Sequence, residues 1–235
     1  MKKHLFIGNF DFNSPQQTIL TIKDKELANQ IKNVLRFKIG DTIYLGNGQE
    51  MEAKTKIQEI KKDEVVVEIV ATQANVNEYV RDVTLYLAIL KRENFELVVQ
   101  KATEIGIKKI VPVISERTIK TGFKTERLEK IIKEAAEQSG RGLLPSITEP
   151  LKFVDATKQA QANQLNLFFH LGGQNIKDLK ITQKKLGLFI GPEGGWSDNE
   201  VAVIKKSDTF IDVSLGKLTL RGETAAIVAC YLSLQ

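Results

Sequence analysis

The 235-residue chain has few of the side chains that metal and redox sites need. It contains one cysteine, Cys230, and two histidines, His4 and His170. A single cysteine cannot form an intramolecular disulfide, which fits a reducing compartment. For the same lack of ligands, a zinc site built from His and Cys is close to excluded. The sequence therefore predicts a protein that works without a bound metal.

Long apolar runs are also missing. The first eight residues begin with a basic pair, but Asn9 and Asp11 interrupt the apolar stretch that a signal peptide would require. No segment approaches the length that spans a membrane. We expect a cytoplasmic protein without membrane contact.

Composition favours a folded chain with a modest basic excess. A hydrophobic content of 42% supports a real core, and the net charge is +5. The basic residues are spread along the chain, so any phosphate-binding face has to be made by folding. An ordinary solvated lysine surface would give the same charge.

Short strand-like runs separated by turns fill the N-terminal third of the chain. One helix interrupts them, with apolar residues at helical spacing from Leu27 to Leu35 after a possible Asp24 cap. This pattern predicts a small β-barrel with one helix over residues 1–73. The polar, weakly patterned residues 71–81 are expected to form the linker. The strand-like runs are 5–8, 18–22, 42–45, 51–60 and 65–70.

Strands and helices alternate after the linker, which favours a mostly parallel α/β sheet over residues 74–235. A helix is expected from an Asn94 cap to Gly106, and another over 125–139, closed by Gly140. Ligands of such sheets bind outside the carboxyl ends of the strands. The expected strands are 83–90, 110–114, 165–169, 186–190 and 210–213.

Two glycine-bearing loops follow the last two of these strands. The first, Gly191-Pro192-Glu193-Gly194-Gly195, leads into a capping box in which Ser197 is the cap and Glu200 returns to it. Glycines let backbone groups approach a small molecule closely, although they would also serve a tight turn. The spacing is neither GxGxxG nor GxxxxGK[ST], which weakens dinucleotide and nucleoside triphosphate readings.

The pairing of these loops carries a resemblance. "IGPEGGWSDNE" at 190–200 and "VSLGKLTLRGETAA" at 213–226 resemble the ribosomal RNA small-subunit methyltransferase E family of the SPOUT superfamily. "FELVVQKATEIGI" at 95–107, "SER" at 115–117, "EAAEQSGR" at 134–141 and "VLRFKIGD" at 34–41 extend the likeness over almost the whole chain. Gly222 departs from the threonine usual in the family, and Trp196 from a commoner phenylalanine.

The resemblance implies a fold, a reaction and partners. The fold is α/β: a PUA-like or OB-like β-barrel joined to a SPOUT domain with a deep trefoil knot. The reaction is methylation of uridine N3 in 16S ribosomal RNA by S-adenosylmethionine, with the small ribosomal subunit as substrate. The domain forms a homodimer. Two alternatives stay open: a SPOUT enzyme acting on another RNA such as tRNA, and a non-catalytic RNA-binding assembly factor.

The resemblance also implies site residues. Arg221 is expected to orient the uracil or hold its developing negative charge, because a guanidinium stays charged and can fork to two acceptors. Glu223 or Glu193 is expected to take the N3 proton. Simpler readings are a surface ion pair between Arg221 and Glu223, and a helix-start carboxylate for Glu193. The expected cofactor-binding residues are Leu171, Gly172, Ile190, Gly191, Glu193, Gly194, Gly195, Leu215, Gly216 and Leu220.

RNA contacts are expected on both domains. The matched segments offer cationic and polar side chains that could bind phosphates, although surface charge and helix capping explain them equally well. These candidates are Arg36, Lys38, Arg117, Gln138 and Arg141.

Overall fold

The computed structural model describes residues 3–12, 18–119, 122 and 124–235. The chain divides into two compact units, which we describe separately. Unit 1 comprises Met1–Glu78 and Ala136–Leu144, and unit 2 comprises Tyr79–Ala135 and Pro145–Gln235. The short stretch 136–144, placed with the second domain on sequence grounds, therefore packs with the first.

Unit 1 is built on a five-stranded sheet with the order β1-β3-β4-β5-β2. β1 pairs with β3 in parallel, and the other neighbours are antiparallel. β1 and β2 lie at opposite edges of this sheet. Where a barrel was expected, the described residues form a five-stranded sheet. The strands are β1 (Leu5–Ile7), β2 (Ile19–Ile22), β3 (Thr42–Gly46), β4 (Met51–Ile60) and β5 (Val65–Ala74).

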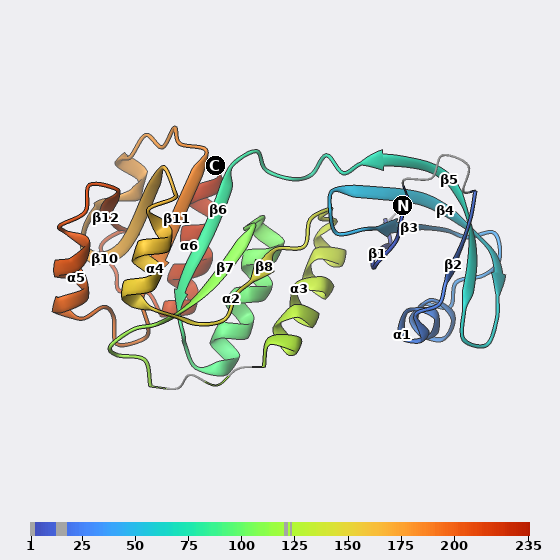
Figure 1. Cartoon of the computed structure of the whole chain (residues 1–235), viewed down its shortest axis with the longest axis horizontal. Helices are drawn as coiled ribbons and strands as arrows, with labels where there is room; N and C mark the ends of the chain where they lie inside the picture. The colour runs from blue at the N-terminus through green and yellow to red at the C-terminus, as the bar shows by residue number, and fades with distance from the viewer. Residues whose placement is uncertain (1–2, 13–17, 120–121, 123) are drawn as a thin grey trace. The chain divides into compact units, whose positions relative to one another are not determined.

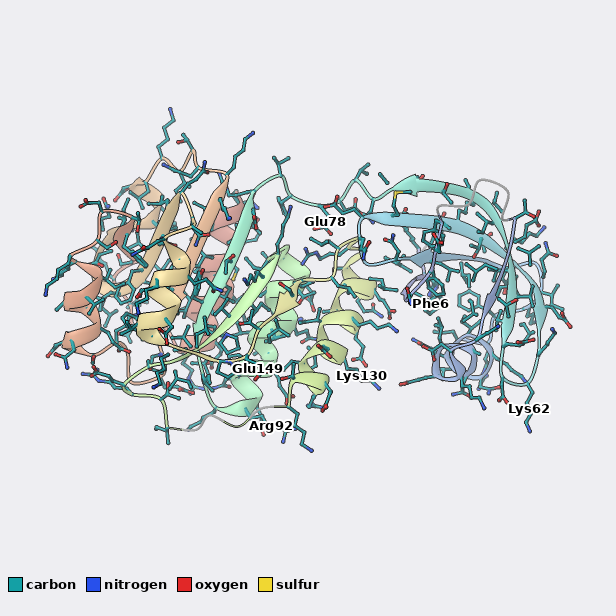
Figure 2. The ribbon with its side chains drawn as sticks, in the orientation of Figure 1. Phe6, Lys62, Glu78, Arg92, Lys130 and Glu149 are labelled. Carbon is teal, nitrogen blue, oxygen red and sulfur yellow. The ribbon has the colours of Figure 1, made fainter. Side chains whose placement is uncertain are left out.

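One helix covers the core of unit 1. α1 (Lys25–Asn29) begins at Asp24, whose carboxylate accepts hydrogen bonds from the amides of Glu26 and Leu27 as the sequence predicts, and it continues through a π-helical turn, Gln30–Val34. Leu27 and Ile31 pack with Phe6 and the inward residues of the strands. Figure 2 labels Phe6 on the side of β1 that faces α1.

The predicted linker is too long at its N-terminal end. β5 continues through Ala74, and its residues 71–74 pair with Met51–Lys54 of β4. The side chains of 71–74 are exposed. Their polarity concealed the strand, because an outward-facing strand needs only backbone pairing to form.

Unit 2 holds a parallel sheet with the order β12-β10-β11-β6-β7-β8, and β9 also pairs with β7. Parallel pairing brings the carboxyl ends of all these strands to one edge. The prediction of a mostly parallel α/β sheet is confirmed. The strands are β6 (Asp82–Ala88), β7 (Lys109–Ile114), β8 (Ser146–Ile147), β9 (Leu151–Lys152), β10 (Leu165–Asn175), β11 (Lys185–Ile190) and β12 (Phe210–Ser214).

Helices cover both faces of this sheet (Figure 1). α4 and α5 pack on an aromatic cluster in which Trp196 stacks on Phe168 and Tyr86 on Phe189. α2 and α6 pack together on the opposite face. Gly106 and Gly140 end α2 and α3 with positive φ angles, as predicted. The helices are α2 (Arg92–Ile105), α3 (Thr125–Ser139), α4 (Phe153–Ala160), α5 (Asp198–Ile204) and α6 (Gly222–Leu234), with a 3-10 turn at Ile176–Asp178.

Two local predictions in unit 2 need correction. α2 begins at Arg92, and the residue at its cap is Lys91, so Asn94 lies inside the first turn and does not cap the helix. The sequence analysis also missed α4, although Phe153, Ala156, Thr157 and Ala160 are buried at helical spacing. No helix among the described residues is long and apolar enough to cross a membrane.

Candidate functional site

Three glycine-bearing loops meet at the carboxyl edge of the unit 2 sheet. The first lies within β10, at residues 170–173, and the other two follow β11 and β12; the three strands are adjacent in the order β12-β10-β11. Because the strands are parallel, the loops leave the same edge. The sheet therefore collects the candidate cofactor residues of segments 171–172, 190–195 and 215–220.

The loop after β11 makes a tight turn into α5. Gly195 has a φ of +68°, and its amide donates to the Pro192 carbonyl at 2.8 Å. The predicted capping box is confirmed: the Ser197 hydroxyl accepts from the Glu200 amide, and the Glu200 carboxylate accepts from the Ser197 amide. A Cβ at Gly191 would lie 3.2 Å from the Trp196 ring, so this position favours glycine.

The first loop, residues 170–173, is a bulge inside β10. The pairing of β10 with β12 shifts between Phe169 and Gln174, so residues 170–173 bulge outward. Gly173 passes so close to β12 that a Cβ there would lie 2.4 Å from the Val213 amide nitrogen. Leu171 in this bulge is 66% exposed, an apolar side chain presented at the edge of the sheet.

The loop after β12 returns to the β11 loop. Gly216 has a φ of +129°, and Leu220 is 36% exposed. A Cβ at Gly222 would lie 3.1 Å from Leu90 and 3.7 Å from the Gly191 carbonyl oxygen. Gly222, the departure from the family pattern, thus spares the Leu90 side chain a tight contact, whereas a Cβ would make only an ordinary contact with the Gly191 carbonyl.

Arg221 and Glu223 stand together at the start of α6. The guanidinium Nη1 lies 4.0 Å from Glu223 Oε1; the Arg221 side chain is 87% exposed and that of Glu223 is 12% exposed. Glu223 Oε2 is buried, and among the described residues it has no hydrogen-bond partner. Buried carboxylate oxygens are normally paired, so this acceptor is suited to a ligand donor or a proton.

Glu193 has a different environment. Its Oε1 accepts a hydrogen bond from the Lys91 amide at 3.0 Å, at the start of α2. Glu193 therefore binds the start of a helix, as the simpler reading expected. That helix is α2, about a hundred residues earlier in the chain, and not α5, which follows Glu193. Because Lys91 is so distant in the chain, this pairing could not be predicted from local sequence.

The RNA candidates lie in different places. In unit 1, Arg36, Lys38 and Gln138 are exposed, and Arg36 has an unusual φ of +57° for a residue with a Cβ. In unit 2, Arg117 is exposed, and its Nη1 donates to the Gly194 carbonyl at 2.7 Å.

Arg141 is placed otherwise. Its side chain is 4% exposed and forms a two-bond pair with the Glu78 carboxylate, which also accepts from the amides of Gly142 and Leu143. Figure 2 labels Glu78 on the segment that leaves β5. A guanidinium buried in such a pair is not a surface phosphate ligand, and we drop Arg141 from the RNA-binding set.

Other reactive groups leave little alternative chemistry. Burial raises the pKa of the Cys230 thiol to about 12, so it is not a thiolate nucleophile at neutral pH. Among the described residues, no group of three or more His, Cys, Asp or Glu side chains could hold a metal ion. The site offers backbone groups on glycine loops, exposed apolar side chains, the Arg221 guanidinium and the buried Oε2 of Glu223.

These features fit S-adenosylmethionine. Its adenine can pack on apolar side chains such as Leu171 and Leu220. Gly195 and Gly216 leave open space where a Cβ would stand, so backbone can approach the ligand.

Comparisons with known proteins agree with both units. Residues 77–233 match the RNA methyltransferase domain family, and residues 23–70 match the RNA methyltransferase PUA domain family. A ribosomal RNA small subunit methyltransferase E from Synechocystis is 32% identical, covering 92% of this chain and 74% of its own. The protein of that name from Rickettsia conorii is 31% identical, covering 86% and 84%.

Solved structures show the same fold. A ribosomal RNA small subunit methyltransferase E from Neisseria gonorrhoeae, bound to S-adenosylmethionine, superposes with a TM-score of 0.89 at 26% identity, covering 97% of this chain and 95% of its own. A methyltransferase from Legionella pneumophila, also with that cofactor, gives 0.87 at 30% identity, covering 98% and 96%.

Proposed function

Because the chain belongs to the ribosomal RNA small subunit methyltransferase E family, we propose that it methylates N3 of one uridine in 16S ribosomal RNA, with S-adenosylmethionine as methyl donor. The observation that carries the proposal is the meeting of three glycine-bearing loops at one sheet edge, next to Arg221 and Glu223. The substrate is the RNA of the small ribosomal subunit.

The cofactor is held by the bulge inside β10 and by the loops after β11 and β12. Backbone groups of Gly191, Gly194, Gly195 and Gly216 approach it, and the apolar side chains of these loops pack on its adenine. The passage from β11 to β12 across β10 supports a trefoil knot in this part of the chain. An experimental trace of residues 163–235 tests the knot.

The residues at the start of α6 act on the target base. When bound, S-adenosylmethionine supplies an activated sulfonium methyl group. Arg221 donates to one carbonyl oxygen of the uracil, which leaves the N3 edge open, and stabilises the negative charge that develops on the ring. Glu223 accepts the N3 proton through its uncommitted Oε2 and becomes a neutral carboxyl group. The freed N3 lone pair then takes the methyl group as the bond from that group to the sulfonium sulfur breaks, which leaves a neutral thioether.

RNA binding begins on unit 1. Arg36 and Lys38 supply exposed positive charge, and Gln138 supplies an amide. Arg36→Ala should weaken RNA binding and reduce the slope of log affinity against log salt by about one phosphate contact. An unchanged slope would remove Arg36 from the RNA contact set.

The second copy in a homodimer covers α6. This helix is largely apolar, and Tyr231 on it is 54% exposed, with Val228 half-buried one turn earlier. Light scattering at micromolar concentration should give twice the 26.3 kDa chain mass, and Tyr231→Asp should shift the protein toward one copy. A wild-type monomer would contradict the dimer.

Cofactor binding separates the enzyme from an assembly factor that only binds RNA. Isothermal titration of S-adenosylmethionine into the protein should give a dissociation constant in roughly the micromolar range. Gly195→Val should abolish binding, because a β-branched residue does not adopt its φ of +68°. The absence of binding by the wild-type protein would favour the assembly factor.

A further inference from the structure

Hydrogen bonds from residues on both sides of β11 in the sheet converge on the β11 loop and the start of α5. After β6, the Lys91 amide donates to Glu193 Oε1; after β7, Arg117 Nη1 donates to the Gly194 carbonyl. Within β10, the Phe169 carbonyl accepts from Trp196 Nε1 at 3.2 Å. The Glu116 amide, also after β7, donates to Glu200 Oε1 at 3.0 Å.

We propose that Arg117 and Glu193 are positioning residues that hold the β11 loop in its cofactor-binding conformation, an inference that rests on the proposed function. It moves Arg117 out of the RNA contacts and removes Glu193 as proton acceptor. Neither side chain needs to touch the reacting atoms.

Arg117 fixes one peptide group of the loop. The Gly194 carbonyl and the Gly195 amide belong to the same peptide plane. Arg117 donates to the first at 2.7 Å, and the second donates to the Pro192 carbonyl at 2.8 Å. A peptide between two glycines can otherwise rotate at little cost, since neither residue carries a Cβ. With both polar ends bonded, this peptide keeps one orientation.

The aliphatic part of Arg117 supports the same loop. A Cβ built on Gly194 would lie 3.5 Å from Arg117 Cδ and 3.6 Å from its Cβ, so the stem runs alongside this glycine. An arginine engaged in this way has one side occupied by the loop. Its charge then strengthens the hydrogen bond to the carbonyl, as charged donors generally do.

Glu193 fixes the residue before that peptide. Lys91, the cap residue of α2, has no side-chain capping bond of its own, and the Glu193 carboxylate bonds to its amide. The partial positive charge at the start of a 14-residue helix favours a carboxylate there. Glu193 thus ties the β11 loop to a long helix packed on the sheet.

The two bonds act on the conformation of the free loop. Losing either one lets the loop sample other conformations, and the cofactor must then select the competent one. Affinity for S-adenosylmethionine falls, while the methyl-transfer step at saturating cofactor is unchanged.

Four substitutions and one control test this role in the full-length protein. Arg117→Ala and Glu193→Ala remove the bonds. Glu193→Gln keeps an oxygen acceptor for the Lys91 amide. Arg117→Lys keeps the positive charge but loses the planar guanidinium group. The control is Arg127→Ala, which removes an equal charge and a surface pair with Glu96 on α2 but no bond to the β11 loop. Four quantities are measured: hydrogen exchange of residues 191–196 in the free protein, cofactor affinity, the methylation rate at saturating cofactor, and the salt dependence of RNA binding.

We expect exchange at the Gly195 amide to be about tenfold faster in Arg117→Ala than in the wild type. Cofactor affinity should fall about fivefold to tenfold in both alanine variants. Arg117→Lys should lie between Arg117→Ala and the wild type. Glu193→Gln should stay within about twofold of the wild type in cofactor affinity, because its amide oxygen still accepts from the Lys91 amide. The Arg127→Ala control should leave exchange of the loop as it is.

Three results would overturn the proposal. Unchanged exchange in Arg117→Ala would show that the loop does not depend on this residue. A reduced RNA salt slope with unchanged cofactor affinity would make Arg117 a phosphate contact. A loss of methylation rate at saturating cofactor in both Glu193→Gln and Glu193→Ala would return Glu193 to proton transfer. Hydrogen exchange needs no cofactor, so wild-type protein that fails to bind S-adenosylmethionine would refute the proposed function, and the exchange comparison would still decide the positioning role.

Discussion

At the residue scale, the two carboxylates of the site, Glu193 and Glu223, differ in their surroundings. Glu193 is exposed and engaged by a backbone amide, whereas Glu223 is mostly buried and keeps one oxygen without a partner among the described residues. A proton acceptor needs an available lone pair near the base. We therefore propose Glu223, rather than Glu193, as the proton acceptor.

Glu223→Gln should therefore lower the methylation rate at saturating cofactor and RNA by about a hundredfold, because an amide cannot take the N3 proton. Its shape is nearly that of glutamate, so cofactor affinity should change little. Single-turnover rates on undermethylated small subunits measure the effect. A rate within threefold of the wild type would exclude Glu223 as the acceptor.

The roles of individual residues could be predicted from the sequence where their partners are close in the chain. The Ser197–Glu200 capping box and the left-handed glycines 106 and 140 follow from spacing alone. Arg141 was misassigned because its partner, Glu78, lies 63 residues earlier. A charged residue buried by a distant partner looks like a surface residue until the fold is known.

At the scale of elements, α2 and α3 are joined by a charged bridge. Glu96 of α2 accepts two hydrogen bonds from Arg127 of α3, each at 2.7 Å, and one from Arg92. The Arg127 bond, helped by Arg92, lowers the pKa of Glu96 from its usual 4.5 to about 2, against the opposing effect of desolvation. The bridge thus favours the ionised carboxylate in the folded protein.

This pKa shift predicts a pH-dependent stability. A lowered folded-state pKa gives stability that is complete above about pH 4.5 and is lost as the pH falls toward 2. Glu96→Gln should therefore reduce the free energy of unfolding by about 1 kcal/mol at pH 7, the arginines being solvent-screened. Urea unfolding of both proteins at pH 7 and pH 3 measures the difference, which should shrink at pH 3. A difference independent of pH would mean that packing, not charge, is responsible.

Helices with a strong amphipathic period were predicted correctly. The ends of elements that depend on a partner elsewhere in the chain were not. α3 has the predicted bounds, because its apolar residues keep a helical period to Gly140. The extension of β5 to Ala74 depends on β4 as its partner, and the start of α2 on a carboxylate from the β11 loop. Neither partner is visible in the local sequence.

At the scale of the whole molecule, alternation of strands and helices predicts a parallel α/β sheet but not the order of its strands. The order β12-β10-β11-β6 brings the loops of three separate segments together, and only the family resemblance pointed to that arrangement. Strand order depends on how the crossovers pack, which composition and periodicity do not encode. The chemistry of the site could therefore be predicted only as far as the resemblance reached.

The most direct measurement supplies isotopically labelled S-adenosylmethionine to the purified protein with undermethylated small ribosomal subunits, naked 16S ribosomal RNA and tRNA in parallel. Mass spectrometry of the digested RNA then locates the label. We predict one labelled position, N3 of a uridine in the small-subunit RNA, and none in tRNA. Label in tRNA, or at any other atom of the ribosomal RNA, would contradict the assigned reaction.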